Sequence, residues 1–112
     1  MSARLKRNYN WLKVIKGCKG KRLKEVMSVA DKDLIYCICE CIQNVLNSNV
    51  KLSQKQRAML KKHGAVLREL ASKKTAIKRK KKLLVQKGGF LPTLLAPVLA
   101  IAGTLLADAL TK

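Results

Sequence analysis

The chain has 112 residues, of which 25 are Lys or Arg and 6 are Asp or Glu, so its formal charge at pH 7 is +19. This length excludes a multidomain protein and allows one domain with tails. Apolar residues make up 48% of the chain, which excludes a disordered basic tail, because such tails are poor in hydrophobic side chains. The self-repulsion of so many bases indicates a polyanionic partner, either nucleic acid or an anionic membrane.

Two short helices are predicted at the N-terminus, over 4–16 and 21–29, because apolar residues recur every three to four positions. The strongest helix is predicted over 32–47. Asp31 stands where an N-cap belongs, Asp33 favours the first turn through the helix dipole, and a wide apolar face follows. This helix is expected to be the buried centre of the domain.

Ser53 followed by Gln56 predicts a capping box that opens a helix reaching about Ala71. Gly64 inside it costs about 1 kcal/mol relative to Ala, which leaves two interpretations open, a break in the helix and a close helix crossing; the crossing is preferred. Ser72 or Thr75 is expected to cap a last basic helix that ends at Gly88-Gly89. No segment has the pattern of a strand, so the predicted fold is a small all-α helical bundle with a basic helix and an apolar C-terminal helical tail.

The charge is uneven along the chain: the net charge is +8 over 1–30, −2 over 31–50, +13 over 51–87 and zero over 88–112. Together with the helix signals, this divides the chain into a basic N-terminal arm with short helices (1–30), a helical core (31–72), a basic DNA-binding helix ending in Gly-Gly (73–89) and a hydrophobic C-terminal tail (90–112).

The basic run near position 80 wraps around all sides of a helix with only Glu69 nearby, so internal pairing cannot neutralise it. Since lysine dominates and few side chains suit bidentate base reading, the predicted mode is sequence-independent phosphate binding. Residues 51–87 and the basic N-terminal arm are expected to bind the phosphates. Trp11 and Tyr9 are interpreted as packing anchors rather than stacking platforms. The predicted nucleic-acid-binding residues are Lys55, Arg57, Lys61, Lys62, Arg68, Lys73, Lys74, Lys78, Arg79, Lys80, Lys81, Lys82 and Lys87.

The N-terminus lacks a secretory signal, so the four cysteines are expected to be thiols in a reducing compartment. On a helix, Cys37 and Cys41 share one face as core residues, while Cys39 points away as an exposed thiol. A zinc site would need Cys18 or His63 as a further ligand and lacks the usual spacing, so no metal is predicted. His63 is interpreted as a surface or partly buried residue. Paired carboxylates, HExxH and a Walker loop are absent, so we expect no enzyme, no catalytic residue and no cofactor.

Eighteen uncharged residues follow Lys87-Gly88-Gly89, enough for a minimal membrane span, although Pro97 weakens that interpretation. A membrane-active segment, a transmembrane anchor and a tail docked on other proteins all stay open. The predicted membrane or capsid contacts are Leu91, Leu94, Leu95, Val98, Leu99, Ile101, Leu105 and Leu106.

The order of several short motifs resembles a viral family. Residues 80–97, Lys-Lys-Lys-Leu-Leu-Val-Gln-Lys-Gly-Gly-Phe-Leu-Pro-Thr-Leu-Leu-Ala-Pro, resemble the C-terminal junction of the adenovirus core protein X precursor. The Cys-Ile-Cys-Glu-Cys segment at 37–41, Asn-Val-Leu at 44–46, Leu-Ser at 52–53 and the 86–91 junction resemble short proteins of Polinton/Maverick elements and adintoviruses. The second resemblance covers roughly 31–97.

The resemblance implies a virion core protein, located in the virion core and the host nucleus, that condenses double-stranded DNA. It also implies a virus-type cysteine protease as a partner, cutting at Gly88-Gly89-Phe90, between Gly89 and Phe90. The adenovirus protein is Arg-rich and has no cysteine-containing helical middle, and Gln86 stands where its cleavage motif usually has Met, Ile or Leu. Homo-oligomerisation through the helical middle is a further expectation.

Two other functions stay open. One is a membrane-active or membrane-anchored basic protein that binds anionic lipid headgroups. The other is a cellular basic module that binds an acidic protein.

Overall fold

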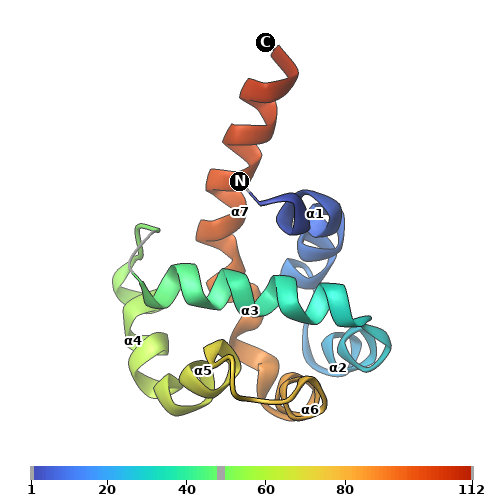
Figure 1. Ribbon diagram of the computed structural model, residues 1–112. Helices are drawn as coiled ribbons and strands as arrows, with labels where there is room; N and C mark the ends of the chain where they lie inside the picture. The colour runs from blue at the N-terminus through green and yellow to red at the C-terminus, as the bar shows by residue number, and fades with distance from the viewer. Residues whose placement is uncertain (1, 48–49, 112) are drawn as a thin grey trace.

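Seven α-helices and one 3₁₀ turn account for most of the protein, whose computed structural model describes residues 2–47 and 50–111, with side chains as far as Gly103. No strand occurs in these described ranges, so the predicted all-α bundle is confirmed (Figure 1). The elements are α1 (Ala3–Lys16), α2 (Gly20–Val29), α3 (Lys32–Leu46), α4 (Gln54–Lys62), α5 (Gly64–Ala71), α6 (Ile77–Lys87), η1 (Gly88–Phe90) and α7 (Leu91–Thr111).

Helix α3 is the centre of the bundle and crosses the middle of Figure 1. The Asp31 carboxylate caps it as predicted, accepting a hydrogen bond from the Leu34 N–H at 2.8 Å. Helices α1, α5, α6 and α7 all pack against α3. The side chains that it buries are Leu34, Ile35, Cys37, Ile38, Cys39, Cys41, Ile42 and Val45.

The single helix predicted from Ser53 to Ala71 is two helices, α4 and α5, which meet at His63. The Ser53–Gln56 capping box is present as predicted. The prediction of a close helix crossing at Gly64 was wrong: a Cβ there would meet only the Arg68 guanidinium on its own helix, at 3.3 Å. The change of direction at His63 instead lets Leu67 and Leu70 of α5 become fully buried.

Helix α6 begins later than predicted and without the predicted caps. Its N-cap is Ala76, which makes no side-chain capping bond, while the Ser72 hydroxyl accepts the Lys74 N–H in the preceding turn. At the other end, Gly88–Phe90 forms the turn η1, and the chain passes straight into α7. The chain thus bends at Gly88-Gly89 but stays helical on both sides.

Helix α7 packs against α1 and α3 and supplies part of the core. It continues through Pro97, which lacks the N–H for one helical hydrogen bond. Near Gly103 it crosses α1 closely, since a Cβ on Gly103 would lie 3.0 Å from the Tyr9 hydroxyl oxygen. Beyond this crossing the helix runs past the rest of the bundle (Figure 1).

Candidate nucleic-acid interface

Two basic helices from distant parts of the sequence lie side by side. Helices α2 and α6 pack against each other, burying Leu23 and Met27 of one and Leu83 and Leu84 of the other. Their outer sides keep lysines and arginines exposed. We call this the α2–α6 basic surface; it comprises Lys21, Arg22, Lys24, Lys78, Lys82 and Lys87.

The three α2 members of this surface, Lys21, Arg22 and Lys24, belong to the N-terminal arm that was predicted as a whole to bind phosphate, but they were not among the individually predicted binding residues. The bases concentrated over 19–24 were the sequence feature that could have identified them. Only the packing of α2 on α6 shows that the bases of these two helices lie next to each other.

A second basic area lies on α4. Lys55, Arg57, Lys61 and Lys62 are all exposed, and α4 contributes no fully buried side chain. We call these four residues the α4 basic surface. Helix α4 lies across the molecule from α2 (Figure 1). The structure therefore separates the predicted bases into two surfaces; Arg68 on α5 and Lys73 and Lys74 in the following turn are exposed between them.

Three members of the run at 78–82 do not behave as predicted. Lys80 is only 4% exposed and places its ammonium over the Tyr36 ring. The Lys81 ammonium donates to the Ala30 carbonyl at 3.1 Å, and Arg79 is paired with Glu69 at 2.8 Å. The run does not face solvent on all sides, because one side of α6 packs into the bundle. Lys78 and Lys82 remain fully available to a phosphate.

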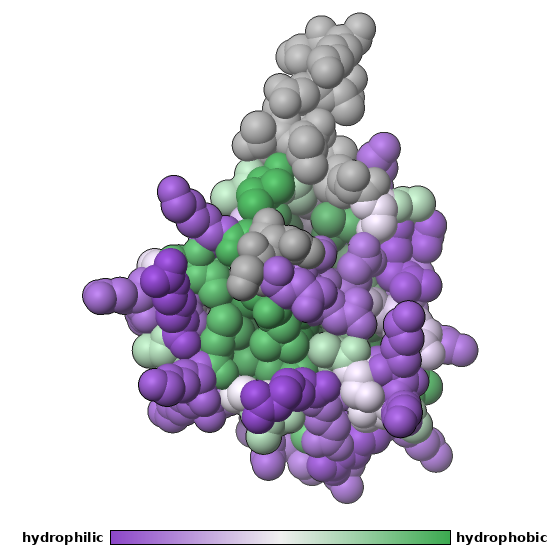
Figure 2. Space-filling view, turned by 60° about the vertical axis from the view of Figure 1, so that its left-hand side comes forward, coloured by the Kyte–Doolittle hydropathy of each residue, from purple (hydrophilic) through white to green (hydrophobic). Residues whose placement is uncertain are grey.

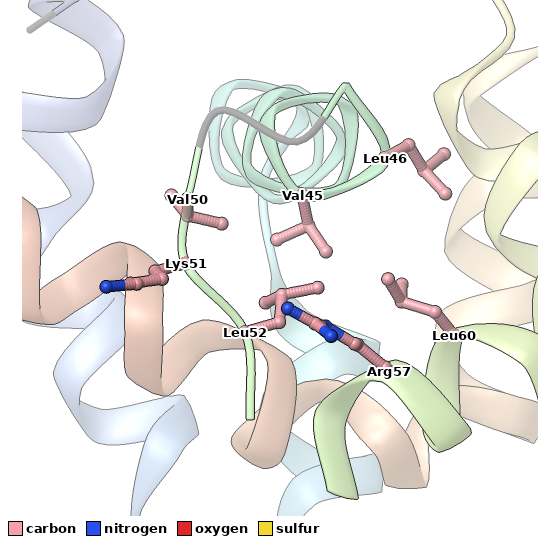
Figure 3. Close-up of a pocket in the computed structure, with 7 residues that line it drawn as sticks. All are labelled: Val45, Leu46, Val50, Lys51, Leu52, Arg57 and Leu60. Atoms are coloured by element: carbon pink, nitrogen blue, oxygen red, sulfur yellow. The ribbon is translucent and has the colours of Figure 1, made fainter. Parts of the chain in front are cut away.

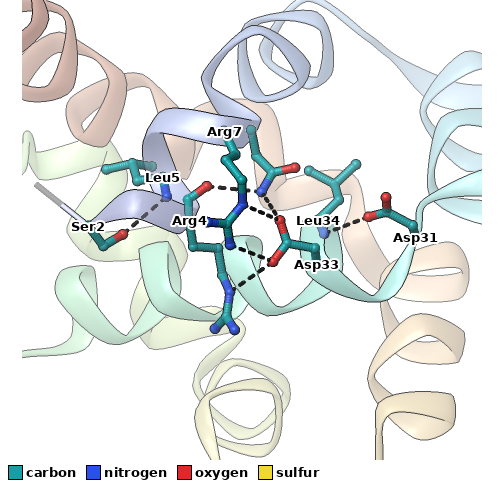
Figure 4. A network of polar contacts seen from close by, with 8 residues as sticks. Ser2, Arg4, Leu5, Arg7, Asp31, Asp33 and Leu34 are labelled. Carbon is teal, nitrogen blue, oxygen red and sulfur yellow. Dashed lines mark hydrogen bonds and ion pairs between the residues drawn. The ribbon is translucent and has the colours of Figure 1, made fainter.

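One carboxylate organises the N-terminal bases (Figure 4). Asp33 accepts hydrogen bonds from Arg4, Arg7 and the Asn8 amide, at distances between 2.8 and 3.3 Å. The hydrogen bond from Arg7 is the largest of the effects that lower the Asp33 pKa to about 2. Arg4 and Arg7 are thus tied to α3, a role that was not predicted for them or for Asp33.

The cysteines form a buried group. Cys39 is 3% exposed, so the prediction of an exposed thiol was wrong; α1, α5, α6 and α7 pack against α3, and Cys39 lies at the floor of a hollow between them rather than on an open surface. Cys37 and Cys41 are buried as predicted. The Cys41 pKa is raised, first by a hydrogen bond with Cys37 and then by burial. Within the described ranges, no group of three or more His, Cys, Asp or Glu side chains is arranged to hold a metal ion.

The Gly88-Gly89-Phe90 segment differs from a flexible, exposed protease site. It forms the turn η1, in which Gly88 is buried, Gly89 is exposed and Phe90 is 2% exposed. The Phe90 ring lies 5.4 Å from the His63 ring, centroid to centroid. The junction is therefore neither extended nor fully exposed, because Phe90 anchors it in the core.

The apolar C-terminal segment is largely part of the domain itself. Five of its predicted membrane or capsid contacts are inside the core: Leu91, Leu94, Leu95, Val98 and Leu99. Ile101 is 43% exposed, while the side chains of Leu105 and Leu106 lie outside the described ones. By length and composition alone, the helical stretch Ile77–Gly103 could cross a membrane, but 44% of its most apolar window is buried inside the protein.

An apolar hollow of about 550 Å³ opens beside the α4 basic surface (Figure 3). Val45, Leu46 and Leu60 line it together with Val50 and Leu52 of the preceding loop, and Arg57 reaches across it. In the space-filling view of Figure 2, the hydrophobic side chains on this face are green, and purple, hydrophilic side chains surround them.

Searches against protein-family models, curated proteins and solved structures find no match to this chain.

Proposed function

We propose that this protein is a virion core protein of a DNA virus or virus-like transposon, which binds double-stranded DNA without sequence preference and condenses it. The observation that carries the proposal is the exposure of the predicted bases. Eleven of the thirteen are exposed, and only Arg79 among them is in an ion pair with a described acid. Unpaired surface ammonium groups are suited to neutralising phosphates and releasing their counterions.

The separation of the two basic surfaces supports condensation in particular. A protein with one basic face coats a duplex, whereas one with bases on two sides can contact two duplexes at once. The α4 and α2–α6 basic surfaces are on different parts of the bundle, with α5 packed between α4 and α6. Each surface offers at least four cations, and bridging of neighbouring duplexes through both is the proposed mechanism.

The salt dependence of binding tests the proposal. If about eight phosphates are neutralised, the logarithm of the association constant should fall with the logarithm of salt concentration at a slope near about −7. Replacing Lys78, Lys82 and Lys87 with Gln should reduce this slope by about three units, since each lost phosphate contact removes about 0.9. The same three positions changed to Arg keep the charge and are the matched control.

Light scattering from duplex DNA tests the bridging step. The triple Gln variant of α6 and a second one at Lys55, Lys61 and Lys62 of α4 should each still bind at low salt but no longer condense DNA. A salt slope that is equal in the Gln and Arg variants would contradict the assigned surface. Strong preference for one duplex sequence would contradict the sequence-independent mode.

A second candidate function is binding to anionic membranes, favoured by the apolar helix α7 that runs past the bundle. Basic side chains would bind the headgroups while the helix enters the acyl region. Partition into phosphatidylserine vesicles without nucleic acid, resistant to high salt, would support this function over DNA condensation.

A further inference from the structure

A second hollow in the surface is lined by cations rather than apolar groups. It has a volume of about 540 Å³ and lies between α1, α3 and the segment from Lys73 into α6. Arg4, Lys73 and Lys80 line it, with Glu40 as the one acid in its wall. Its net charge is therefore positive, and its volume is within the usual range for small-molecule sites.

Lys80 is the unusual member of this wall. The residue is 96% buried as part of α6, yet its ammonium has no hydrogen bond or ion pair with any described residue. Its ammonium nitrogen lies 5.6 Å from the centroid of the Tyr36 ring. No described side-chain nitrogen or oxygen is both buried and without a hydrogen-bond partner, so the Lys80 ammonium keeps contact with solvent through the hollow that it lines. An anion that enters the hollow can therefore reach this ammonium, to which the aromatic ring offers only a weak interaction.

Two more cations surround the same ring. The Arg4 guanidinium carbon is 5.3 Å and the Lys32 ammonium 5.8 Å from the Tyr36 centroid. Arg4 contacts Asp33 through Nε, which leaves its terminal nitrogens to donate elsewhere. Lys32 does not line the hollow, but Arg4 and Lys80 do, and an anion bound there would offset the repulsion between these two cations.

We propose that this hollow binds an anion that carries several phosphate groups, held by Arg4, Lys73 and Lys80. Cationic donors from three separate segments match the many acceptor oxygens of linked phosphates better than the two oxygens of a single carboxylate. The Thr75 hydroxyl in the same wall is a further donor. Such an anion is either a free polyphosphate compound or a stretch of nucleic-acid backbone.

Calorimetric titration with sodium tripolyphosphate tests this site without DNA. The wild-type protein should bind one equivalent saturably, and Lys73→Gln should weaken binding about tenfold through loss of a charge-assisted contact. Glu40→Gln should strengthen binding, because it removes the acid from the wall. Lys78→Gln, an exposed change on α6 outside the hollow, is the matched control and should change affinity less than about threefold.

Lys80→Met tests the buried lysine, keeping an apolar side chain of similar length. Its thermal unfolding shows whether it folds, and when folded it should lose at least as much affinity as Lys73→Gln. If Lys80→Met does not fold, the opposite effects expected of Lys73→Gln and Glu40→Gln still decide the question. Binding that does not saturate, or equal weakening of tripolyphosphate binding by Lys73→Gln and Lys78→Gln, would overturn the proposal. The overall positive charge of the protein would then explain the binding without a defined site.

A DNA titration of the same variants identifies the source of the phosphates. If they belong to nucleic acid, Lys73→Gln should weaken duplex binding more than Lys78→Gln does. If they belong to a free compound, both variants should weaken duplex binding equally while only Lys73→Gln affects tripolyphosphate. If the wild-type protein binds tripolyphosphate but does not bind DNA, the proposed function is rejected, whereas the anion site in the hollow is still supported.

Discussion

The Arg7 guanidinium binds the Asp33 carboxylate through two parallel contacts, Nε to Oδ2 at 3.3 Å and Nη2 to Oδ1 at 3.1 Å. This bidentate pair joins α1 to the first turn of α3. Arg4 and the Asn8 amide complete the group. Arg7 thus helps to hold the bundle together, and we expect it to contribute less to DNA binding than the free lysines of α6.

Asp33→Asn should lower thermal stability at neutral pH and change its dependence on pH. Because the Asp33 pKa is lowered from 3.8 to about 2 in the folded protein, its stabilising effect is complete above the unfolded pKa and is lost as pH falls through about 2. The Asn variant should therefore show a smaller loss of stability than wild type between pH 4 and 2. Thermal melts over this range measure the difference.

Asp31→Asn is the matched control for that experiment. Asn caps a helix about as well as Asp, and the Asp31 carboxylate contacts Leu34 rather than the arginines. Equal melting curves for Asp33→Asn and wild type across the range would show that the arginine contacts do not stabilise the fold.

The buried thiols should be structural and unreactive. All four cysteines are buried; burial raises the Cys39 pKa, with Lys80 acting in the opposite direction, and thiolate is the reactive form. A thiol reagent should therefore modify the native protein only as fast as it unfolds. Cys39→Ala should cost about 1 to 2 kcal/mol of unfolding free energy, whereas Val29→Ala on the surface should be nearly neutral.

DNA affinity of the folded cysteine variants should stay unchanged, because no thiol lies on either basic surface. Stoichiometric zinc in protein purified without added metal, lost together with the fold on chelation, would contradict a purely structural role for the thiols.

Local sequence signals predicted the helices well. The Asp31 cap and the Ser53–Gln56 capping box are both interactions within four residues, so the sequence alone contains them. A break at Gly64 was one of two open interpretations, but the close crossing was preferred. The chain stays hydrogen-bonded on both sides of His63, from His63 N to Met59 O and from Leu67 N to His63 O, so local sequence does not separate the two. Only the packing of α5 against α3 makes the bend favourable.

The exposed thiol wrongly predicted at Cys39 and the unforeseen burial of Lys80 and of the start of the C-terminal segment share one cause. Each depended on which elements surround a helix, and periodicity along one helix cannot show that. Cys39 is buried because other helices pack against α3 on several sides. Lys80 is buried because α6 directs this side chain toward Tyr36. Leu91 and the apolar residues after it were interpreted as a tail outside the domain because they follow a basic run. In the structure they form α7, which packs against the apolar sides of α1 and α3.

Gly103→Ala should test the crossing of α1 and α7. The added methyl would lie 3.0 Å from the Tyr9 hydroxyl, and we expect this overpacking to exceed the gain in helix propensity, for a net loss of about 1 kcal/mol. In a Tyr9→Phe background the clash is absent, so the same change should become neutral or stabilising by up to about 1 kcal/mol. Chemical denaturation of the four proteins in this cycle gives the coupling.

Gly89→Ala is the control for the helix crossing, because a Cβ at that position has no other atom within 4 Å. It should not be destabilising. A loss from Gly103→Ala that persists unchanged in the Tyr9→Phe background would show that the hydroxyl is not what limits the approach of the helices.

Cleavage between Gly89 and Phe90, which the resemblance implies and which stays a proposal, should require the turn η1 to open. A protease binds an extended substrate strand, yet this bond lies in a 3₁₀ turn whose Phe90 side is buried against His63. The rate of cleavage should then follow the population of the opened form. Leu84→Ala removes a buried side chain beneath Gly88 without changing residues 86–91, and should accelerate cleavage.

The expected size of that effect follows from the cost of the cavity. A decrease of about 2 to 4 kcal/mol in the free energy of unfolding raises the population of the opened form at least about tenfold. This holds if the turn opens together with the core around it. Val29→Ala, which shortens an exposed side chain, is the control and should leave the rate unchanged. Intact mass measurement after incubation with an adenovirus-type cysteine protease detects the product ending at Gly89. Equal rates in wild type and Leu84→Ala would show that the junction is cut in its folded form, and absence of this product even from the destabilised variant would reject processing at this bond.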